Sequence, residues 1–206
     1  FSDPIADGTV IQKAYFSALS NGFKLRDFFW IAKNFREQSD KKLVLMSYYN
    51  PIYRTGIREF VEKAYSSGVD AMLVVDLPFD EANEFVQICR EIGMKNVFLS
   101  APNTSEERLK AIDKLSEFIY LVSTYGVTGV RDKLSERAFN ALKRAKMVCR
   151  TPIAVGFGVS KREHVVDLFK AGANGVVVGS AIVKLIEHFG DKAGKEIERF
   201  TAELKS

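Results

Sequence analysis

Short apolar runs rich in β-branched residues alternate with longer amphipathic segments along most of the chain, recurring roughly every 20 to 35 residues. The runs are Leu43–Met46, Ala71–Val75, Val97–Leu99, Phe118–Val122, Ile153–Val155 and Gly175–Val178. Runs this short and this apolar are typical of strands buried on both faces. Their alternation with helical segments predicts a parallel sheet, because each crossover returns the chain to the end of the sheet from which the next strand starts.

The segments between the runs have the spacing of amphipathic helices, with apolar residues three and four positions apart. Two examples are Phe60, Val61, Ala64 and Tyr65, and Leu134, Ala138, Leu142 and Ala145. Ser105 and Ser160 stand where helices should begin, Ser105 as the first residue of a capping box. Gly68, Gly93 and Gly172 stand where helices should end.

Alternating strands and helices allow either an open doubly wound sheet or a portion of a (βα)8 barrel, and the first block favours the barrel. Phe1 to Gly8 has the character of a loop that follows a strand, and Thr9 to Ser20 that of the next helix. The chain is therefore expected to begin inside a βα unit, without the first strand, first helix and second strand of the barrel. We predict an α/β fold over residues 1–206, a single barrel domain that is incomplete at its N-terminus.

Composition excludes several other classes of protein. The chain is 47% hydrophobic and 27% charged, the balance of a folded domain rather than a disordered one. Basic and acidic residues are interleaved despite a net charge of +4, so we expect no nucleic-acid partner but a small anionic substrate. No uncharged stretch approaches the roughly 20 residues of a membrane span, and no export signal is visible. The widely separated Cys89 and Cys149 are predicted to be reduced thiols of a cytoplasmic protein.

Glycines cluster where the last three predicted strands end. They are Gly126 and Gly129 in STYGVTGV, Gly156 and Gly158 in VGFGVS, and Gly179 in VVVGSAIV. Glycine lets backbone N–H groups approach an anion, and a helix that starts at Ser180 points its positive end at that anion. Any single glycine is explained better by a turn. Three such turns at consecutive strand ends favour a bound phosphate ester, with the Ser180 hydroxyl and the Thr128 side chain assisting.

Two carboxylates, Asp3 and Asp7, stand in the opening FSDPIADG block. Asp-Pro and Asp-Gly pairs are above all turn formers, and Asp7 could equally cap the next helix, so a catalytic role remains one alternative. Asp76, in VVDLP, is ambiguous in the same way. His164 and His188 lack metal-ligand spacing and are expected at the surface or at helix ends, and no metal site is predicted. Several tyrosines end strands or enter loops, where they fill the core or line an apolar pocket: Tyr48, Tyr49, Tyr53, Tyr120 and Tyr125.

Seven blocks in this order resemble the tryptophan synthase α subunit family: FSDPIADG, SYYNPIY, VVDLP, APNT, YLVSTYGVTG, VGFGVS and GANGVVVGSAIVK. The similarity runs from Phe1 to about Ile186. It implies a (βα)8 barrel that cleaves indole-3-glycerol phosphate to indole and glyceraldehyde 3-phosphate in tryptophan biosynthesis, a carbon–carbon lyase reaction of the retro-aldol type. It also implies an αββα complex with a β subunit. Pyridoxal phosphate is then expected only in that partner, and no cofactor in this chain.

The resemblance transfers site roles position by position. Asp7 matches the family's catalytic aspartate, which holds the indole N–H, and Tyr120 the tyrosine beside the reacting glycerol carbons. Thr128 and Gly129 match the mobile loop that closes over the site. Contacts to phosphate and indole are implied for Gly156, Phe157, Gly158, Gly179 and Ser180, with Met46, Tyr48 and Leu73 near the indole pocket. The surface that meets the β subunit is implied for Asp3, Pro4, Asn50, Pro51 and Tyr53.

One departure from the family bears on activity. The family's second catalytic carboxylate, a glutamate on the second strand, precedes the FSDP block by a few residues, whereas this chain starts at Phe1. Losing a general acid–base group lowers a rate by about 10²–10⁴, so the chain by itself is expected to be nearly inactive. Two alternatives stay open: another phosphate-binding barrel, such as a sugar-phosphate isomerase or aldolase, and a non-catalytic fragment that only binds ligand or partner.

Overall fold

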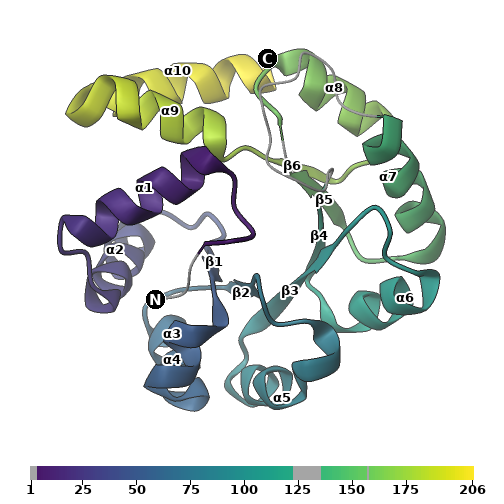
Figure 1. The fold of residues 1–206 in the computed structure, drawn as a ribbon, viewed down its shortest axis with the longest axis horizontal. Coiled ribbons are helices and arrows are strands. Elements are labelled where there is room, and N and C mark those ends of the chain that lie inside the picture. Colours follow the sequence, from purple (N-terminus) through teal and green to yellow (C-terminus); the bar gives the residue numbers. More distant parts are fainter. Residues whose placement is uncertain (1–3, 123–135, 157) are drawn as a thin grey trace.

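The computed structural model describes residues 4–122, 136–156 and 158–206, and their strands form one parallel sheet (Figure 1). The strands are β1 (Val44–Ser47), β2 (Ala71–Val74), β3 (Lys95–Ser100), β4 (Phe118–Val122), β5 (Ile153–Gly156) and β6 (Gly175–Val177). All six predicted strands are confirmed, with small differences at their ends. They are hydrogen-bonded in sequence order, β1-β2-β3-β4-β5-β6, and every pair is parallel.

Helices follow the strands in the expected alternation. They are α1 (Thr9–Ser20), α2 (Leu25–Gln38), α3 (Tyr49–Thr55), α4 (Ile57–Ser66), α5 (Asn83–Ile92), α6 (Glu106–Leu115), α7 (Glu136–Val148), α8 (Arg162–Lys170), α9 (Ser180–Phe189) and α10 (Ala193–Lys205). Two short 3-10 turns, η1 (Phe79–Glu81) and η2 (Gly190–Lys192), precede α5 and α10. Figure 1 shows the helices as an outer ring around a curled sheet.

Strand order decides between the two architectures that the periodicity allowed. An open doubly wound sheet reverses its strand order and carries helices on both faces. Here the order never reverses, so successive right-handed crossovers place the helices on the same face. The fold is therefore of the (βα) barrel class. The described residues hold six strands where a complete barrel has eight, in line with the expectation that two are absent.

The sheet separates a large apolar core from a small one. The large core lies between the sheet and the outer helices, and Phe60, Met72, Leu109, Leu142 and Leu168 are each almost fully buried in it. The small cluster consists of Ala71, Leu73 and Val97, against which partly buried residues such as Leu99 and Tyr120 pack. Because side chains alternate along a strand, these residues share the inner face of the sheet. That inner face is the one available to a ligand.

The observed helix ends confirm some of the helix starts and stops that the sequence predicts and contradict others. Gly68, Gly93 and Gly172 follow helices with φ near +90°, a conformation that glycine adopts without strain. Ser105 does cap α6, since its Oγ accepts the Arg108 N–H at 3.3 Å. The capping box is wrong, because the third helical residue is Arg108 and offers no carboxylate. The expected start directly after Ser160 is displaced by one residue, because Lys161 is the N-cap residue and α8 begins at Arg162.

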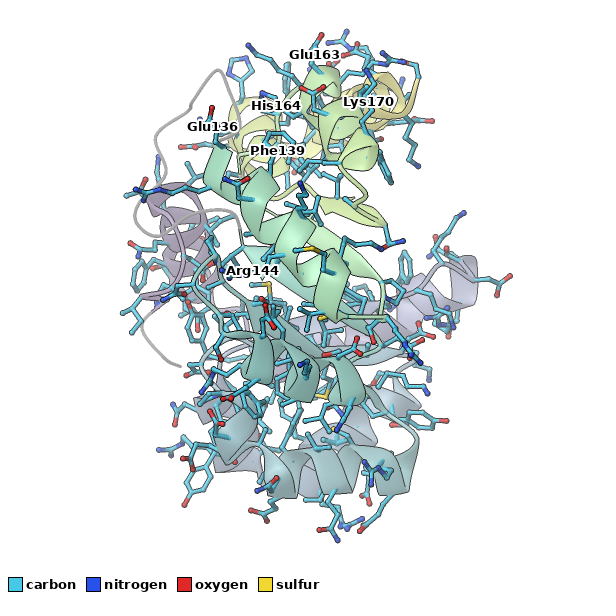
Figure 2. All side chains as sticks on the ribbon, turned by 90° about the vertical axis from the view of Figure 1, so that its right-hand side faces the viewer. Glu136, Phe139, Arg144, Glu163, His164 and Lys170 are labelled. Carbon is cyan, nitrogen blue, oxygen red and sulfur yellow. The ribbon has the colours of Figure 1, made fainter. Side chains whose placement is uncertain are left out.

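His164 departs from the expectation of a surface histidine. It lies near the start of α8, as a helix-end residue should (Figure 2). Only 5% of it is exposed. Its Nδ1 accepts the Ser160 N–H at 3.4 Å, so the ring packs beneath the loop that leads into its own helix. His188, in contrast, lies exposed in the last turn of α9, as predicted. The burial of His164 depends on how α8 packs in the tertiary structure, and the spacing of residues along the sequence does not reveal that packing.

Both cysteines are free and buried, which confirms that they are not disulfide-bonded. Burial raises the pKa of Cys89 to about 12 and, with the charge of Asp113, that of Cys149 to about 11. A thiol with so high a pKa is protonated at neutral pH and is a poor nucleophile. The two residues therefore act as small apolar side chains of the core.

A charged cluster fastens α2 to the starts of β1 and β2. Arg36 donates to the Gly68 carbonyl from Nη2 at 2.8 Å and to Asp70 Oδ2 at 2.6 Å. The same carboxylate accepts the Leu43 N–H at 2.9 Å and the Lys42 ammonium at 2.8 Å. Burial opposes the ionisation of Asp70, but these hydrogen bonds and the two cations outweigh it and lower its pKa. The ionised carboxylate thus stabilises the fold.

We predict that Asp70→Asn lowers the free energy of unfolding at about pH 7 by about 1–3 kcal/mol, the usual range for hydrogen bonds to charged groups. Since the pKa of Asp70 is lower in the folded state, its contribution is present above the unfolded value of about 3.9 and is lost as the pH falls through the folded value. Urea unfolding at about pH 7 and about pH 3 measures the difference. Glu59→Gln, which removes an exposed pair with Lys63, is the control. An equal loss at both pH values would contradict the prediction.

Candidate functional site

The carboxyl ends of the six parallel strands meet at one rim of the sheet, and the candidate residues gather there. Tyr48 directly follows β1, Tyr120 lies within β4, and Gly156 ends β5. Gly179 and Ser180 lie two and three residues beyond β6, at the start of α9. In barrels of this class, functional side chains come from the carboxyl ends of different strands and from the loops that follow them. The strands thus bring together residues far apart in sequence.

The loop that carries Asp7 is folded by its own backbone and by α1. The Asp7 N–H donates to the Pro4 carbonyl at 3.0 Å, which closes a turn. Gln12, in the first half of α1, donates from Nε2 to the carbonyls of Pro4 at 3.1 Å and Asp7 at 3.0 Å. Gly8, and not Asp7, is the N-cap residue of α1, and the structure describes no side-chain cap there. The alternative that Asp7 caps this helix is therefore excluded.

The Asp7 carboxylate meets the phenol of Tyr48. The Tyr48 hydroxyl donates to Asp7 Oδ2 at 2.7 Å and accepts the Ala6 N–H at 3.2 Å. Only 6% of Tyr48 is exposed. Burial, followed by the hydrogen bond from the hydroxyl to Asp7, raises the pKa of Tyr48, so the phenol stays protonated at neutral pH. The pair is a carboxylate held by a buried donor that cannot itself ionise.

Tyr120 crosses the inner face toward the same carboxylate. Burial, with the negative charge of Asp7 as the second cause, raises the pKa of Tyr120 to about 12. Its ring lies directly over Gly156 on the neighbouring strand. A Cβ placed on Gly156 would lie 2.1 Å from the Tyr120 hydroxyl oxygen and 2.4 Å from Cζ. Gly156 is therefore the residue that lets the tyrosine lie across β5.

Apolar side chains cover the inner face beside these groups. Leu73 is 2% exposed and pairs in register with Met46 on β1 and Val97 on β3. Met46, on the same face, is half exposed and open to a ligand. The surface is suited to a flat apolar ring, with the Asp7 carboxylate at its edge.

Glycine turns follow β5 and β6, which are neighbours in the sheet. Gly158 has a φ of +67° and is exposed, and a side chain there would be strained. Gly179 and Ser180 are also exposed at the start of α9, and no acidic residue occupies the first turn of that helix. A Cβ on Gly179 would make only an ordinary contact with Ile11 of α1. An anion can therefore approach the α9 N-terminus without repulsion from its first turn.

Several predicted residues lie outside the described residues: Asp3, Gly126, Thr128, Gly129 and Phe157. Of the residues predicted to face a partner, Pro4 is buried, whereas Asn50 and Pro51 are partly exposed at the start of α3. Tyr53, farther along α3, is 69% exposed. Tyr53 thus presents a largely exposed aromatic side chain on a short helix near the rim, and such a side chain is available for an interface.

Two structural roles near the rim were not resolved from the sequence. Asp76, the ambiguous carboxylate after β2, accepts the Tyr49 N–H at 2.6 Å and so caps α3. Arg144 of α7 donates to the carbonyls of Pro102 and Thr104 and fixes the loop that follows β3 (Figure 2). The Asp-Leu-Pro motif is typical of a carboxylate that binds backbone N–H groups. Nothing local indicates that the partner of Asp76 lies 27 positions earlier, and nothing local marks the role of Arg144.

The described ranges contain no group of three or more His, Cys, Asp or Glu side chains that could hold a metal ion. None of their helices is long and apolar enough to cross a bilayer. The rim residues described above offer proton transfer, hydrogen bonding and anion binding by protein groups.

We predict that Gly156→Ala lowers the free energy of unfolding by about 1–3 kcal/mol, because the new methyl group overlaps the Tyr120 ring. In the Tyr120→Ala background the same change should cost much less, since the obstructing ring is gone. Urea denaturation of the four proteins measures this coupling. Gly194→Ala, where a Cβ would meet nothing within 4 Å, is the control and should leave stability unchanged or slightly raised. Equal costs in both backgrounds would contradict the packing described here.

In the comparison with known proteins, the family model and the relatives in sequence indicate the same family. The family model described as tryptophan synthase alpha chain matches residues 1–206. The tryptophan synthase alpha chain of Archaeoglobus fulgidus is 65% identical over 206 residues, which cover 100% of this chain and 83% of the relative. That of Pyrococcus furiosus is 58% identical over 205 residues, 99% of this chain and 83% of the relative.

Solved structures agree in fold as well as in sequence. A structure described as the tryptophan synthase a2b2 complex of the hyperthermophile Pyrococcus furiosus matches with a TM-score of 0.95 and 58% identity. The match covers 99% of this chain and 83% of the solved one. With the whole chain matched by the family model and close relatives covered over most of their length, this chain belongs to the tryptophan synthase alpha chain family.

Proposed function

We propose that this chain is the lyase subunit that cleaves indole-3-glycerol phosphate to indole and glyceraldehyde 3-phosphate in tryptophan biosynthesis. The observation that carries the proposal is the placement of Asp7. Its carboxylate lies at the rim, is held by Tyr48 and faces the half of the site where Tyr120 crosses the sheet. Family membership indicates the substrate, which has an indole ring, a glycerol chain and a phosphate. The rim residues offer an acid–base group, an apolar surface and an anion-binding turn for these three parts.

The substrate fits the site in one orientation. The indole ring lies against Leu73 and Met46 with its N–H toward the Asp7 carboxylate. The glycerol carbons extend past Tyr120. The phosphate reaches the turns at Gly158 and Gly179, where backbone N–H groups and the Ser180 hydroxyl donate to it. Binding of the phosphate would hold the reacting carbons in place, so that binding energy from a part that does not react assists the chemical step.

The reaction is a retro-aldol cleavage that moves one proton from the substrate's hydroxyl to its ring. Protonation of the indole carbon that bears the glycerol chain gives a cationic ring, and the Asp7 carboxylate stabilises its N–H. The proton of the adjacent glycerol hydroxyl goes to a general base, and the carbon–carbon bond breaks as the aldehyde forms. That base is proposed to be the glutamate that the family carries on its second strand, which this sequence does not include. The bonding electrons return to the ring and restore indole. Tyr120, protonated at neutral pH, lies beside the bond that breaks and can hydrogen-bond to the glycerol oxygens.

The chain is proposed to work with a β subunit in an αββα complex. A solved relative is described as an a2b2 complex. Exposed Tyr53 and the neighbouring Asn50 and Pro51 on α3 supply a surface near the rim, so a partner docked there would lie next to the Asp7 loop. Pyridoxal phosphate is proposed to belong to that partner, as the family resemblance implies.

We expect Asp7→Asn to lower kcat for indole release by about 10²–10⁴, because the amide cannot neutralise the positive ring. Indole formation from indole-3-glycerol phosphate in the whole enzyme is the measurement. Asp167→Asn, an exposed carboxylate on α8, is the matched control and should leave the rate unchanged. A sugar-phosphate isomerase or aldolase would have no use for a carboxylate beside an aromatic N–H, so an active Asp7→Asn enzyme would count against the proposed reaction.

Tyr53→Asp should weaken association with the β subunit by about tenfold or more, because it puts a charge where an aromatic side chain is expected to be buried. Co-elution on a sizing column, followed by titration calorimetry, gives the affinity. Met147→Asp, at a residue of α7 that is 73% exposed, is the control. Unchanged affinity of the Tyr53 variant would remove α3 from the proposed interface.

A further inference from the structure

Tyr48 is held in place on both sides by its backbone neighbours. The Ser47 carbonyl accepts the Val75 N–H at 2.9 Å from the adjacent strand. On the other side, the Tyr49 N–H is bound by the Asp76 carboxylate at 2.6 Å. The Ser47 hydroxyl also donates to the Tyr48 carbonyl at 2.9 Å. Since both strands belong to the sheet, the phenol projects from one of the better fixed parts of the rim.

Asp7, in contrast, belongs to a loop that is open to solvent. Ala6 is exposed, and Ile5 is 82% exposed. The hydrogen bonds from Gln12 and the turn at Pro4 fix the backbone of this loop, but they do not engage the carboxylate itself. Rotation about the side-chain bonds of Asp7 would move its oxygens even with the backbone fixed. A contact to the carboxylate is therefore what determines where its oxygens point.

The hydrogen-bond directions show which way the Tyr48 proton points. The Ala6 N–H donates to the phenol oxygen at 3.2 Å, so that oxygen acts as an acceptor on one side. Its own O–H then donates to Asp7 Oδ2 at 2.7 Å. Binding of Oδ2 leaves Oδ1 to accept a donor from the ligand. The loop backbone and the carboxylate are thus joined through one buried hydroxyl.

We propose that Tyr48 is a positioning residue, whose hydroxyl fixes the Asp7 carboxylate so that its second oxygen faces the ring N–H of the substrate. This inference rests on the proposed function, because it assigns Tyr48 a role only through Asp7. A side chain that merely lined an apolar pocket would need no hydroxyl, and phenylalanine would serve equally well. Small displacements of a catalytic group reduce rates sharply, which gives a fixed carboxylate a functional advantage.

The test is Tyr48→Phe in the whole enzyme. The ring stays and the hydroxyl is lost, so we expect kcat for indole release to fall about tenfold, while KM rises no more than about threefold. Tyr65→Phe, at a half-exposed tyrosine of α4, is the matched control and should behave as the wild type. Circular dichroism and thermal unfolding of the variants verify that they are folded.

A double-mutant cycle separates positioning from packing. Its readout is the affinity for a non-cleavable analogue, an indole ring joined to phosphate by a saturated chain, measured by calorimetry. Tyr48→Phe should weaken binding about threefold when Asp7 is present and leave it unchanged in the Asp7→Ala background. An equal loss in both backgrounds, or no loss in kcat, would overturn the inference alone. Full activity of Asp7→Ala would overturn the proposed function, and the inference with it.

Discussion

Parallel pairing in strict sequence order is the constraint on which the rest of this structure depends. Each strand begins at the same end of the sheet, so each strand also ends at the same rim. Asp7 thereby comes to share one site with Tyr120 and Gly156, which lie more than a hundred positions farther along the chain. The same constraint places the helices on the outside, where they bury the large core, and leaves the inner face to a small apolar cluster and the ligand.

The rim combines strand ends held by the sheet with a loop that is open to solvent. Backbone hydrogen bonds hold the ends of the strands, and Asp76 caps α3 directly behind Tyr48. The Asp7 loop has fewer ties, and its carboxylate is engaged by a hydroxyl from the rigid part. Tyr120 fits across β5 only because position 156 has no side chain. Precise placement of catalytic groups thus depends on contacts between elements rather than on any one loop.

Charge in this protein is used locally. The single Asp70 carboxylate joins α2 to two strand starts, far from the rim, and its ionisation contributes to stability. At the rim, burial, assisted by Asp7, raises the pKa of both neighbouring phenols and so keeps them protonated. The two carboxylates illustrate that the same side chain can hold elements of the fold together in one place and, as proposed for Asp7, take part in chemistry in another, according to the donors around it.

Short β-branched runs, helical spacing and glycines at helix ends were enough to place the six strands and the main helices, because these patterns report local burial and backbone freedom. The family resemblance, carried by motifs such as FSDPIADG and VGFGVS, identified the rim residues. The sequence alone could not choose between catalysis and capping for Asp7, or between chemistry and capping for Asp76. It placed His164 at the surface or at a helix end, and only the helix end is correct, because the side chain is buried. Those outcomes depend on which side chains meet across strands and helices, and such meetings are decided only when the tertiary fold brings distant segments together.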